Sequence, residues 1–299
     1  MSARDASLTD QLKSWPLLVL PHQLLSRVVR HATRWRSKWW KNTLIRQFIR
    51  HFDVDMSQAT AASAGDYADF NSFFTRALKP GARAFPGDVN AIASPVDGRV
   101  SQIGSITAGQ LIQAKGRNYS VSSLLGGHTD RAASFDNGNF ATLYLSPRDY
   151  HRIHMPCQGK LLQTTYIPGR LFSVAPHTTR VIPDLFARNE RLVCLFETPA
   201  GQMALIMVGA IFVSCMETVW SGIVNPGMGM QLQRNRYDMN NSSVTDLARG
   251  DEMGRFNMGS TVILLFGPNR INWDKSLHAG SPIQLGQQLA QLSASSPGR

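Results

Sequence analysis

The sequence predicts an α+β protein in which N-terminal helices precede a strand-rich, mostly antiparallel β core with barrel-sandwich-like features. Residues 21–41 place apolar and basic side chains on opposite sides of a helix, which is the amphipathic pattern. From about residue 90 onward, short apolar runs alternate with Gly, Pro, Asn and Asp, which is typical of strands joined by turns. The 299-residue chain is 43% hydrophobic and 17% charged, so it is globular and can bury a substantial core.

The first element is a basic amphipathic helix that Pro21 can open, because its fixed φ and missing N–H do no harm there. The first 50 residues hold ten Lys or Arg against two Asp, which is +8 of the net charge of +11. Such a helix can lie in the headgroup layer with its cations on anionic lipid, or it can pack its apolar side on the protein. Both interpretations stay open, and nucleic acid is not expected because the tryptophans lie opposite the cations. The apolar side holds Leu24, Leu25, Val28, Val29, Ala32, Trp35, Trp39 and Trp40, and the basic side holds Arg27, Arg30, Arg34, Lys38 and Lys41.

The sequence predicts no membrane-spanning segment, no disulfide framework and no metal site. Residues 1–10 are polar and include acids, unlike a signal peptide. The longest apolar run, residues 203–216, is shorter than the roughly 20 residues of a spanning helix. The three cysteines, Cys157, Cys194 and Cys215, are odd in number and lack C-x-x-C spacing, so a reducing compartment is expected.

The body of the chain is expected to consist mainly of strands, after a more helical stretch at residues 52–83. Residues 94–100 and 155–161 resemble the strand starts of barrel-sandwich folds, and residues 280–289 resemble their G-x-x-I-x-x-G-Q-x-L turns. No M-K-M-like triplet occurs, so a carrier domain with a lysine-borne cofactor is not expected. The expected strands are residues 91–103, 140–145, 159–165, 192–197, 202–208 and 261–266.

Two histidines three positions apart, His151 and His154, follow a predicted strand and a Ser-Pro turn. Loops on a rigid scaffold often hold catalytic groups, and histidine exchanges protons near neutral pH. The pair could also ligate zinc or lie on the surface. No Cys or Glu nearby completes a zinc set, and the spacing is not that of helix-borne zinc histidines.

Ser260 lies between Gly259 and Thr261 and opens a very apolar strand. It is not a hydrolase nucleophile elbow, because Val262 stands where G-x-S-x-G requires glycine. A Gly–Ser pair has one special use. The Ser260 hydroxyl can attack the Gly259 carbonyl, and elimination of the resulting ester leaves a dehydroalanine that hydrolyses to a pyruvoyl group. The pair could also be no more than a strand start built from small residues.

The tetrapeptide Met258-Gly259-Ser260-Thr261 resembles the L-G-S-T cleavage motif of phosphatidylserine decarboxylases, with Met in place of Leu. Four further segments resemble the short bacterial members of this family in the same order, and together they cover roughly residues 65–270. These segments are Phe73-Phe74-Thr75-Arg76-Ala77-Leu78-Lys79-Pro80-Gly81 with Arg83, Ser94-Pro95-Val96-Asp97-Gly98, Lys115-Gly116-Arg117-Asn118-Tyr119-Ser120, and Tyr150-His151-Arg152-Ile153-His154-Met155-Pro156.

The resemblance implies a self-processing triad of Asp97, His154 and Ser260, with chain cleavage between Gly259 and Ser260. Ser260 becomes the pyruvoyl cofactor, and His151 is the matched proton donor in decarboxylation. The implied substrate is phosphatidylserine and the product is phosphatidylethanolamine, formed on an anionic membrane surface. The resemblance also suggests a homodimer. A peripheral site on the cytoplasmic face of the bacterial inner membrane agrees with the missing signal peptide.

On this basis the chain divides into three parts. Residues 1–65 are a basic amphipathic helical membrane-contact segment, residues 66–292 are the decarboxylase catalytic domain, and residues 293–299 are a disordered tail. Within the domain, the β chain ends at residue 259 and the α chain begins at residue 260.

Three alternatives predict different behaviour. A lipid-directed serine hydrolase or acyltransferase would use Asp97, His154 and Ser260 without chain cleavage. A non-catalytic membrane-binding module would keep its role after His151→Ala and Ser260→Ala. A pyruvoyl enzyme for a soluble amino acid would leave the basic amphipathic segment unexplained.

Overall fold

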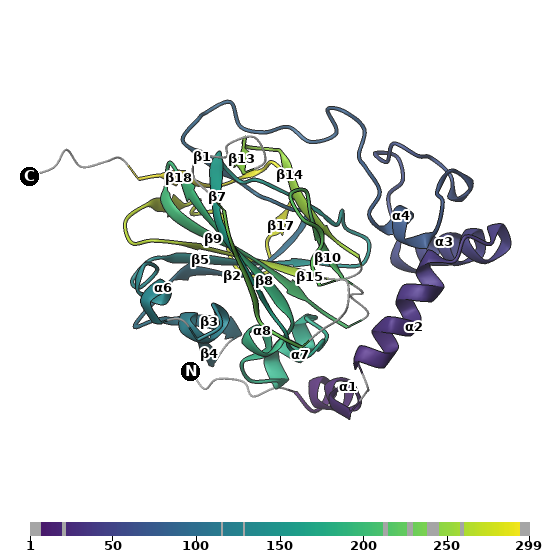
Figure 1. Cartoon of the computed structure of the whole chain (residues 1–299), viewed down its shortest axis with the longest axis horizontal. Helices are drawn as coiled ribbons and strands as arrows, with labels where there is room; N and C mark the ends of the chain where they lie inside the picture. The colour runs from purple at the N-terminus through teal and green to yellow at the C-terminus, as the bar shows by residue number, and fades with distance from the viewer. Residues whose placement is uncertain are drawn as a thin grey trace, which may run out of the picture.

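The structure is a computed structural model that describes residues 7–19, 22–114, 116–127, 129–211, 215–225, 230–237, 245–257 and 260–293. Helices from the N-terminal part of the chain lie beside a strand-rich body (Figure 1). The predicted fold class is confirmed, because N-terminal helices are followed by a core of mostly antiparallel strands. The predicted tail lies outside the described residues from 294 onward.

The main sheet contains nine strands in the described part of the chain. Its neighbouring strands pair antiparallel, and β15 lies near the middle between β9 and β5. The order is β12 (Gln233–Arg236), β7 (Gly159–Ile167), β8 (Arg191–Thr198), β9 (Gly201–Gly209), β15 (Ser260–Phe266), β5 (Asn139–Leu145), β2 (Gly98–Ser105) and β17 (Pro282–Ile283), with β13 (Asp246–Leu247) on β7.

Smaller sheets and short helices complete the body. The sheet that contains β14 and β6 matters most for the site, because it joins the two segments that lead to the candidate catalytic residues. The three smaller sheets are β1 (Ala91–Ala93), β18 (Gln288–Leu292) and β16 (Ile271–Trp273); β11 (Gly222–Ile223), β10 (Met216–Thr218), β14 (Glu252–Phe256) and β6 (Arg152–His154); and β3 (Gln110–Ala114) with β4 (Arg117–Ser120). The short helices are η1 (Ala64–Asp66), α4 (Phe70–Phe74), α5 (Val121–Leu124), α6 (Thr129–Ala133), α7 (Pro176–Val181) and α8 (Leu185–Arg188).

Five of the six expected strands appear as single strands, but the strand expected at residues 91–103 is split into β1 and β2. Pro95 cannot donate a ladder hydrogen bond, and Gly98 has a φ of +151°. A Cβ atom at Gly98 would lie 2.2 Å from the main-chain oxygen of Tyr144, so only glycine fits. The split lets β1 pair with β18 while β2 enters the main sheet beside β5.

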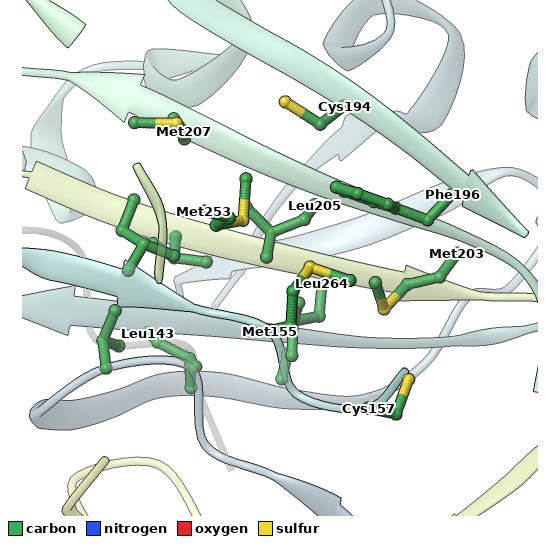
Figure 2. Packing of buried hydrophobic residues seen from close by; sticks show 14 of the residues in the cluster. Leu143, Met155, Cys157, Cys194, Phe196, Met203, Leu205, Met207, Met253 and Leu264 are labelled. Atoms are coloured by element: carbon green, nitrogen blue, oxygen red, sulfur yellow. The ribbon is translucent and has the colours of Figure 1, made fainter. Parts of the chain in front are cut away.

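The core lies on both faces of the main sheet. Side chains alternate between the faces of a strand, and β15 is buried along its whole length. Its residues Val262 and Leu264 belong to one apolar cluster, and Ile263 belongs to a second cluster on the other face. Figure 2 shows Met155, Met203 and Leu264 together in the first cluster. This burial fixes the strand that begins at Ser260.

The N-terminal helices are α1 (Leu8–Val19), α2 (His22–Arg34) and α3 (Lys38–Phe52). The sequence predicted one helix through residues 21–41, but the structure breaks it after Arg34. The Trp40 indole donates a hydrogen bond of 2.8 Å to the Ala32 carbonyl, which occupies one of the free acceptors at the end of α2. Phe48 and Phe52 on α3 pack against the phenylalanines of α4.

The apolar side of α2 does not pack wholly on the protein. Leu24 is 60% exposed and Trp39, at the start of α3, is 76% exposed, whereas Ser26 and Thr33 on the opposite side of α2 are buried. Arg34 turns toward the body, where it lies 3.8 Å from Glu217. The further exposed apolar side chains of this region are Leu8, Leu12, Trp15, Val28 and Trp35. Within the described residues, no helix combines the length and the hydropathy needed to span a membrane.

Candidate functional site

Ser260 is the first residue of β15, and its position follows from the sheet register. It lies opposite Leu145 at the end of β5 and Gly209 at the end of β9. The residue is fully buried, and its Oγ has no hydrogen-bond partner in the structure as described. Gly259, the other half of the predicted cleavage site, lies outside the described residues.

An apolar cavity of about 270 Å³ lies beside Ser260. Side chains from α3, α4 and the ends of neighbouring strands line it, among them Phe48, Phe52, Phe74, Leu145, Val174 and Ile211. A hydroxyl group buried without a partner in apolar surroundings costs free energy. Such unpartnered buried groups are uncommon in folded proteins, so the Ser260 Oγ is a candidate functional group.

His151 lies in the segment that joins β5 to β6 and is fully buried. Its Nδ1 lies 2.8 Å from the Asp149 carbonyl, which can only accept, so Nδ1 donates and Nε2 is the unprotonated nitrogen of the neutral ring. Nε2 has no partner in the described part of the chain. The ring lies 4.1 Å, between centroids, from Phe74, which also lines the cavity beside Ser260. Burial lowers the pKa of His151 to about 3, so the ring is held neutral.

His154 lies on β6, and both of its ring nitrogens have partners. Nδ1 donates to the Gly250 carbonyl at 2.7 Å, so Nε2 accepts from the Tyr150 hydroxyl at 3.0 Å. Burial is the main cause that lowers the pKa of His154. His154 pairs with Glu252 on β14, whereas the His151 carbonyl accepts a hydrogen bond from Phe256. The chain that runs toward Ser260 therefore passes His154 first and His151 last.

Asp97 lies in the turn between β1 and β2, and its carboxylate has partners other than a histidine. Arg83 donates to both carboxylate oxygens, and the Leu285 N–H donates to Oδ1 at 2.7 Å. Asp97 lines a polar cleft of about 340 Å³ together with Tyr150, the residue that donates to His154. The structure thus brings Asp97 and His154 to one region without a direct hydrogen bond between them.

Arg83, Tyr150 and Phe74 lie inside the family-like segments, but the sequence alone predicts no role for them. The structure gives each a contact with a predicted site residue: Arg83 with Asp97, Tyr150 with His154, and Phe74 with His151. Their positions inside the family-like segments are the sequence signal that could have identified them. Among the described residues, no group of three or more His, Cys, Asp or Glu could hold a metal ion.

A family model for phosphatidylserine decarboxylase matches residues 70–291 of this chain. The chain belongs to the phosphatidylserine decarboxylase family. A second family model, described as PSD, matches residues 12–53, which cover much of α1 and all of α2 and α3.

Bacterial members of this family match the chain over nearly its whole length. The chain is 52% identical over 275 residues to a protein of Azotobacter vinelandii, a match that covers 92% of this chain and 96% of the relative. A protein of Ectopseudomonas mendocina is 50% identical over 276 residues, with the same coverage. A protein of Stutzerimonas stutzeri is 50% identical over 273 residues, covering 91% of this chain and 92% of the relative. All three are named phosphatidylserine decarboxylase proenzyme.

Proposed function

We propose that this protein is a self-processing, pyruvoyl-dependent phosphatidylserine decarboxylase that acts at a membrane surface. The observation that supports it most strongly is the fully buried Ser260, whose Oγ has no hydrogen-bond partner at the start of a central strand. This serine lies within the family match and beside an apolar cavity lined by Phe74, whose ring also contacts the His151 ring. The names of the relatives describe proenzymes, in agreement with a chain that is cut to become active.

Self-cleavage begins when Ser260 Oγ attacks the Gly259 carbonyl carbon and a base takes the hydroxyl proton. The peptide C–N bond then breaks, the freed amine takes a proton, and residue 259 is joined to Ser260 by an ester. Loss of the Ser260 α-proton and cleavage of the Cβ–O bond release the Gly259 carboxylate and leave dehydroalanine. Its tautomer reacts with one water molecule and releases ammonia, so that a pyruvoyl group heads the α chain.

Two histidines are candidates for the base that takes the Ser260 hydroxyl proton. In the predicted triad, His154 takes the proton and Asp97 stabilises the cation that forms. For that role His154 must exchange its hydrogen bond with Tyr150 and Asp97 must turn from Arg83. His151 already presents an unprotonated Nε2 without a partner in the described chain, so it is the second candidate.

The site around Ser260 fits a pyruvoyl group. The residue is buried, is attached to a fixed strand and borders an apolar cavity, so a carbonyl there is shielded from bulk water. When formed, the group supplies an electrophilic carbonyl that accepts the electron pair released with CO₂. His151 then delivers a proton to the carbon that lost CO₂. Because burial keeps the His151 ring neutral, a nearby anionic substrate is needed to raise its pKa before it can donate.

The two chains should stay together after cleavage. β15, the first strand of the α chain, is hydrogen-bonded to β9 and β5, which both belong to the β chain. Its side chains Val262, Leu264 and Phe266 lie in the core cluster. Leaving the β chain would expose all of this apolar surface to water.

The N-terminal helices are proposed to bring the site to the lipid. Leu24, Val28 and Trp39 expose apolar surface that can enter the interfacial layer of an anionic membrane. Trp39 lies on α3, which also contributes Phe48 and Phe52 to the cavity beside Ser260, so this helix connects the exposed surface to the site. The protein is further proposed to act as a homodimer that is peripherally bound to the cytoplasmic face of the bacterial inner membrane.

A release assay tests the activity. Vesicles that contain carboxyl-labelled phosphatidylserine should yield labelled CO₂ and phosphatidylethanolamine with the wild-type protein and neither with Ser260→Ala. Free serine, offered at the same concentration, should yield none. Release from free serine alone would support the soluble amino acid alternative, and no release with either substrate from a cleaved protein would refute the decarboxylase proposal.

A further inference from the structure

The segment that enters the cleavage site is anchored at Asn257. This side chain is fully buried, and its amide Nδ2 donates to Glu217 Oε1 at 2.8 Å and to the Cys215 sulfur. Its Oδ1 accepts from Asn71 Nδ2 at 2.8 Å, and its main-chain N–H donates to the Cys215 carbonyl. Asn257 is therefore hydrogen-bonded to two segments that lie far from it in the sequence, one at Asn71 and one at residues 215–217.

The partners of Asn257 are themselves held in place. Glu217 Oε2 lies 3.5 Å from the Arg255 Nε, and Glu217 Oε1 lies 3.8 Å from Arg34 at the end of α2. The Arg34 guanidinium also donates to the Cys215 sulfur at 3.6 Å. Asn71 belongs to α4, whose phenylalanines pack on α3. The anchor thus joins the N-terminal helices to the strand that leads to the cleavage site.

Asn257 stands two residues before Gly259 and three before Ser260. Ser260 is held on the other side by its register with Leu145 and Gly209. The scissile bond therefore lies in a link of two residues between two fixed points. Attack of Ser260 on Gly259 needs the hydroxyl oxygen aligned with one carbonyl carbon, and small losses of alignment reduce such rates strongly.

We infer that Asn257 is a positioning residue for self-cleavage, acting through its amide donor to Glu217 and its acceptor to Asn71. This inference rests on the proposed self-processing. Asn257 touches neither reacting atom in this role. It restricts where the Gly259 carbonyl can lie relative to the strand that presents Ser260.

Because Glu217 is a carboxylate that can only accept, the direction of its hydrogen bond with Asn257 can be tested by substitution. An aspartate at 257 has the shape of asparagine but no amide donor, so its carboxylate would face the carboxylate of Glu217. Changing Glu217 to glutamine at the same time supplies a donor from the other side and keeps the total charge. The pair Asn257→Asp with Glu217→Gln therefore reverses the hydrogen bond, and it keeps one carboxylate in the cluster, at position 257 instead of position 217.

The test follows cleavage of freshly synthesised full-length precursor over time by gel and mass spectrometry. Asn257→Ala and Asn257→Asp should each slow cleavage by about 10- to 100-fold, which corresponds to the loss of an aligning contact. The reversed pair should recover at least about one third of the wild-type rate if that hydrogen bond does the aligning. Thermal unfolding of each variant in a Ser260→Ala background measures stability without interference from cleavage.

Gln113→Ala is the matched control. Gln113 is a buried amide with three hydrogen bonds to the region of α7 and α8, so its loss should lower the melting temperature without slowing cleavage. Wild-type cleavage rates in Asn257→Ala, slowing by Gln113→Ala in proportion to its lost stability, or no recovery in the reversed pair would each overturn the inference. A wild-type chain that is never cut would instead refute the proposed self-processing itself.

Discussion

The neutral state of His151 can be tested through the pH dependence of stability. The pKa of this buried ring is lowered from 6.5 to about 3. Between these values the unfolded chain binds a proton at this position and the folded chain does not, so stability falls as the pH falls below 6.5. Each pH unit is about 1.4 kcal/mol, so at about pH 4.5 the protein loses about 3 kcal/mol through this one residue.

The perturbation is His151→Gln, because glutamine does not titrate and the other groups are the same in both proteins. Denaturant unfolding of the Ser260→Ala precursor, with and without His151→Gln, gives the free energy of unfolding across this pH range. The advantage of the histidine-containing protein should shrink by about 3 kcal/mol between about pH 7.5 and about pH 4.5. Gln113→Ala, which removes a buried amide and no titrating group, should show a difference that is independent of pH. A pH-independent difference for His151→Gln would refute a buried neutral imidazole.

Three further predictions concern the exposed surface of the N-terminal helices, the base for self-cleavage and the turn at Gly98. Trp39→Ala with Val28→Ser should reduce sedimentation with anionic vesicles by several-fold, because both side chains are exposed on the N-terminal helices, and unchanged sedimentation would refute the assigned surface. If His151 is the base for self-cleavage, His151→Ala should slow chain cleavage at least as much as His154→Ala, whereas a much larger effect of His154→Ala in a cleavage time course would favour the predicted triad. Gly98→Ala should lower the melting temperature by several degrees, because its Cβ meets the Tyr144 oxygen at 2.2 Å, and an unchanged melting curve would contradict the close approach.

Much of the fold follows from local patterns. Residues 261–266 were expected as a strand because five consecutive side chains are apolar, and the strand is buried on both faces. The break between β1 and β2 was missed, although Pro95 and Gly98 were both visible as turn residues. The pairing of β1 with β18, almost 200 residues away, has no local signal.

The break between α2 and α3 could not be predicted from helical periodicity. Residues 35–37 contain neither Gly nor Pro, and the contact that accompanies the break is the hydrogen bond from Trp40 to Ala32. The amphipathic pattern also does not predict which side of α2 faces the protein. An amphipathic sequence defines two sides of a helix but not which side meets the protein, and the structure buries Ser26 and Thr33 while Leu24 is exposed.

The sequence predicts which residues belong to the candidate site better than it predicts their hydrogen-bond partners. Ser260 and His151 were singled out by motif, and both prove to be buried with a polar atom that lacks a partner in the described chain. The partners of Asp97 were not predictable, because the Leu285 N–H reaches it from 188 residues away. Asn257 has no motif of its own, and only the tertiary structure shows that it is bonded to Glu217 and Asn71.

In the proposed function, Ser260 cuts its own chain and becomes the cofactor. Denaturing mass spectrometry of freshly purified wild-type protein beside Ser260→Ala tests it most directly. Two wild-type fragments of 259 and 40 residues are expected, the smaller with a pyruvoyl group in place of its N-terminal serine, and one uncut chain is expected for the variant. A folded wild-type protein that stays as a single 299-residue chain would refute self-processing and favour the serine hydrolase alternative.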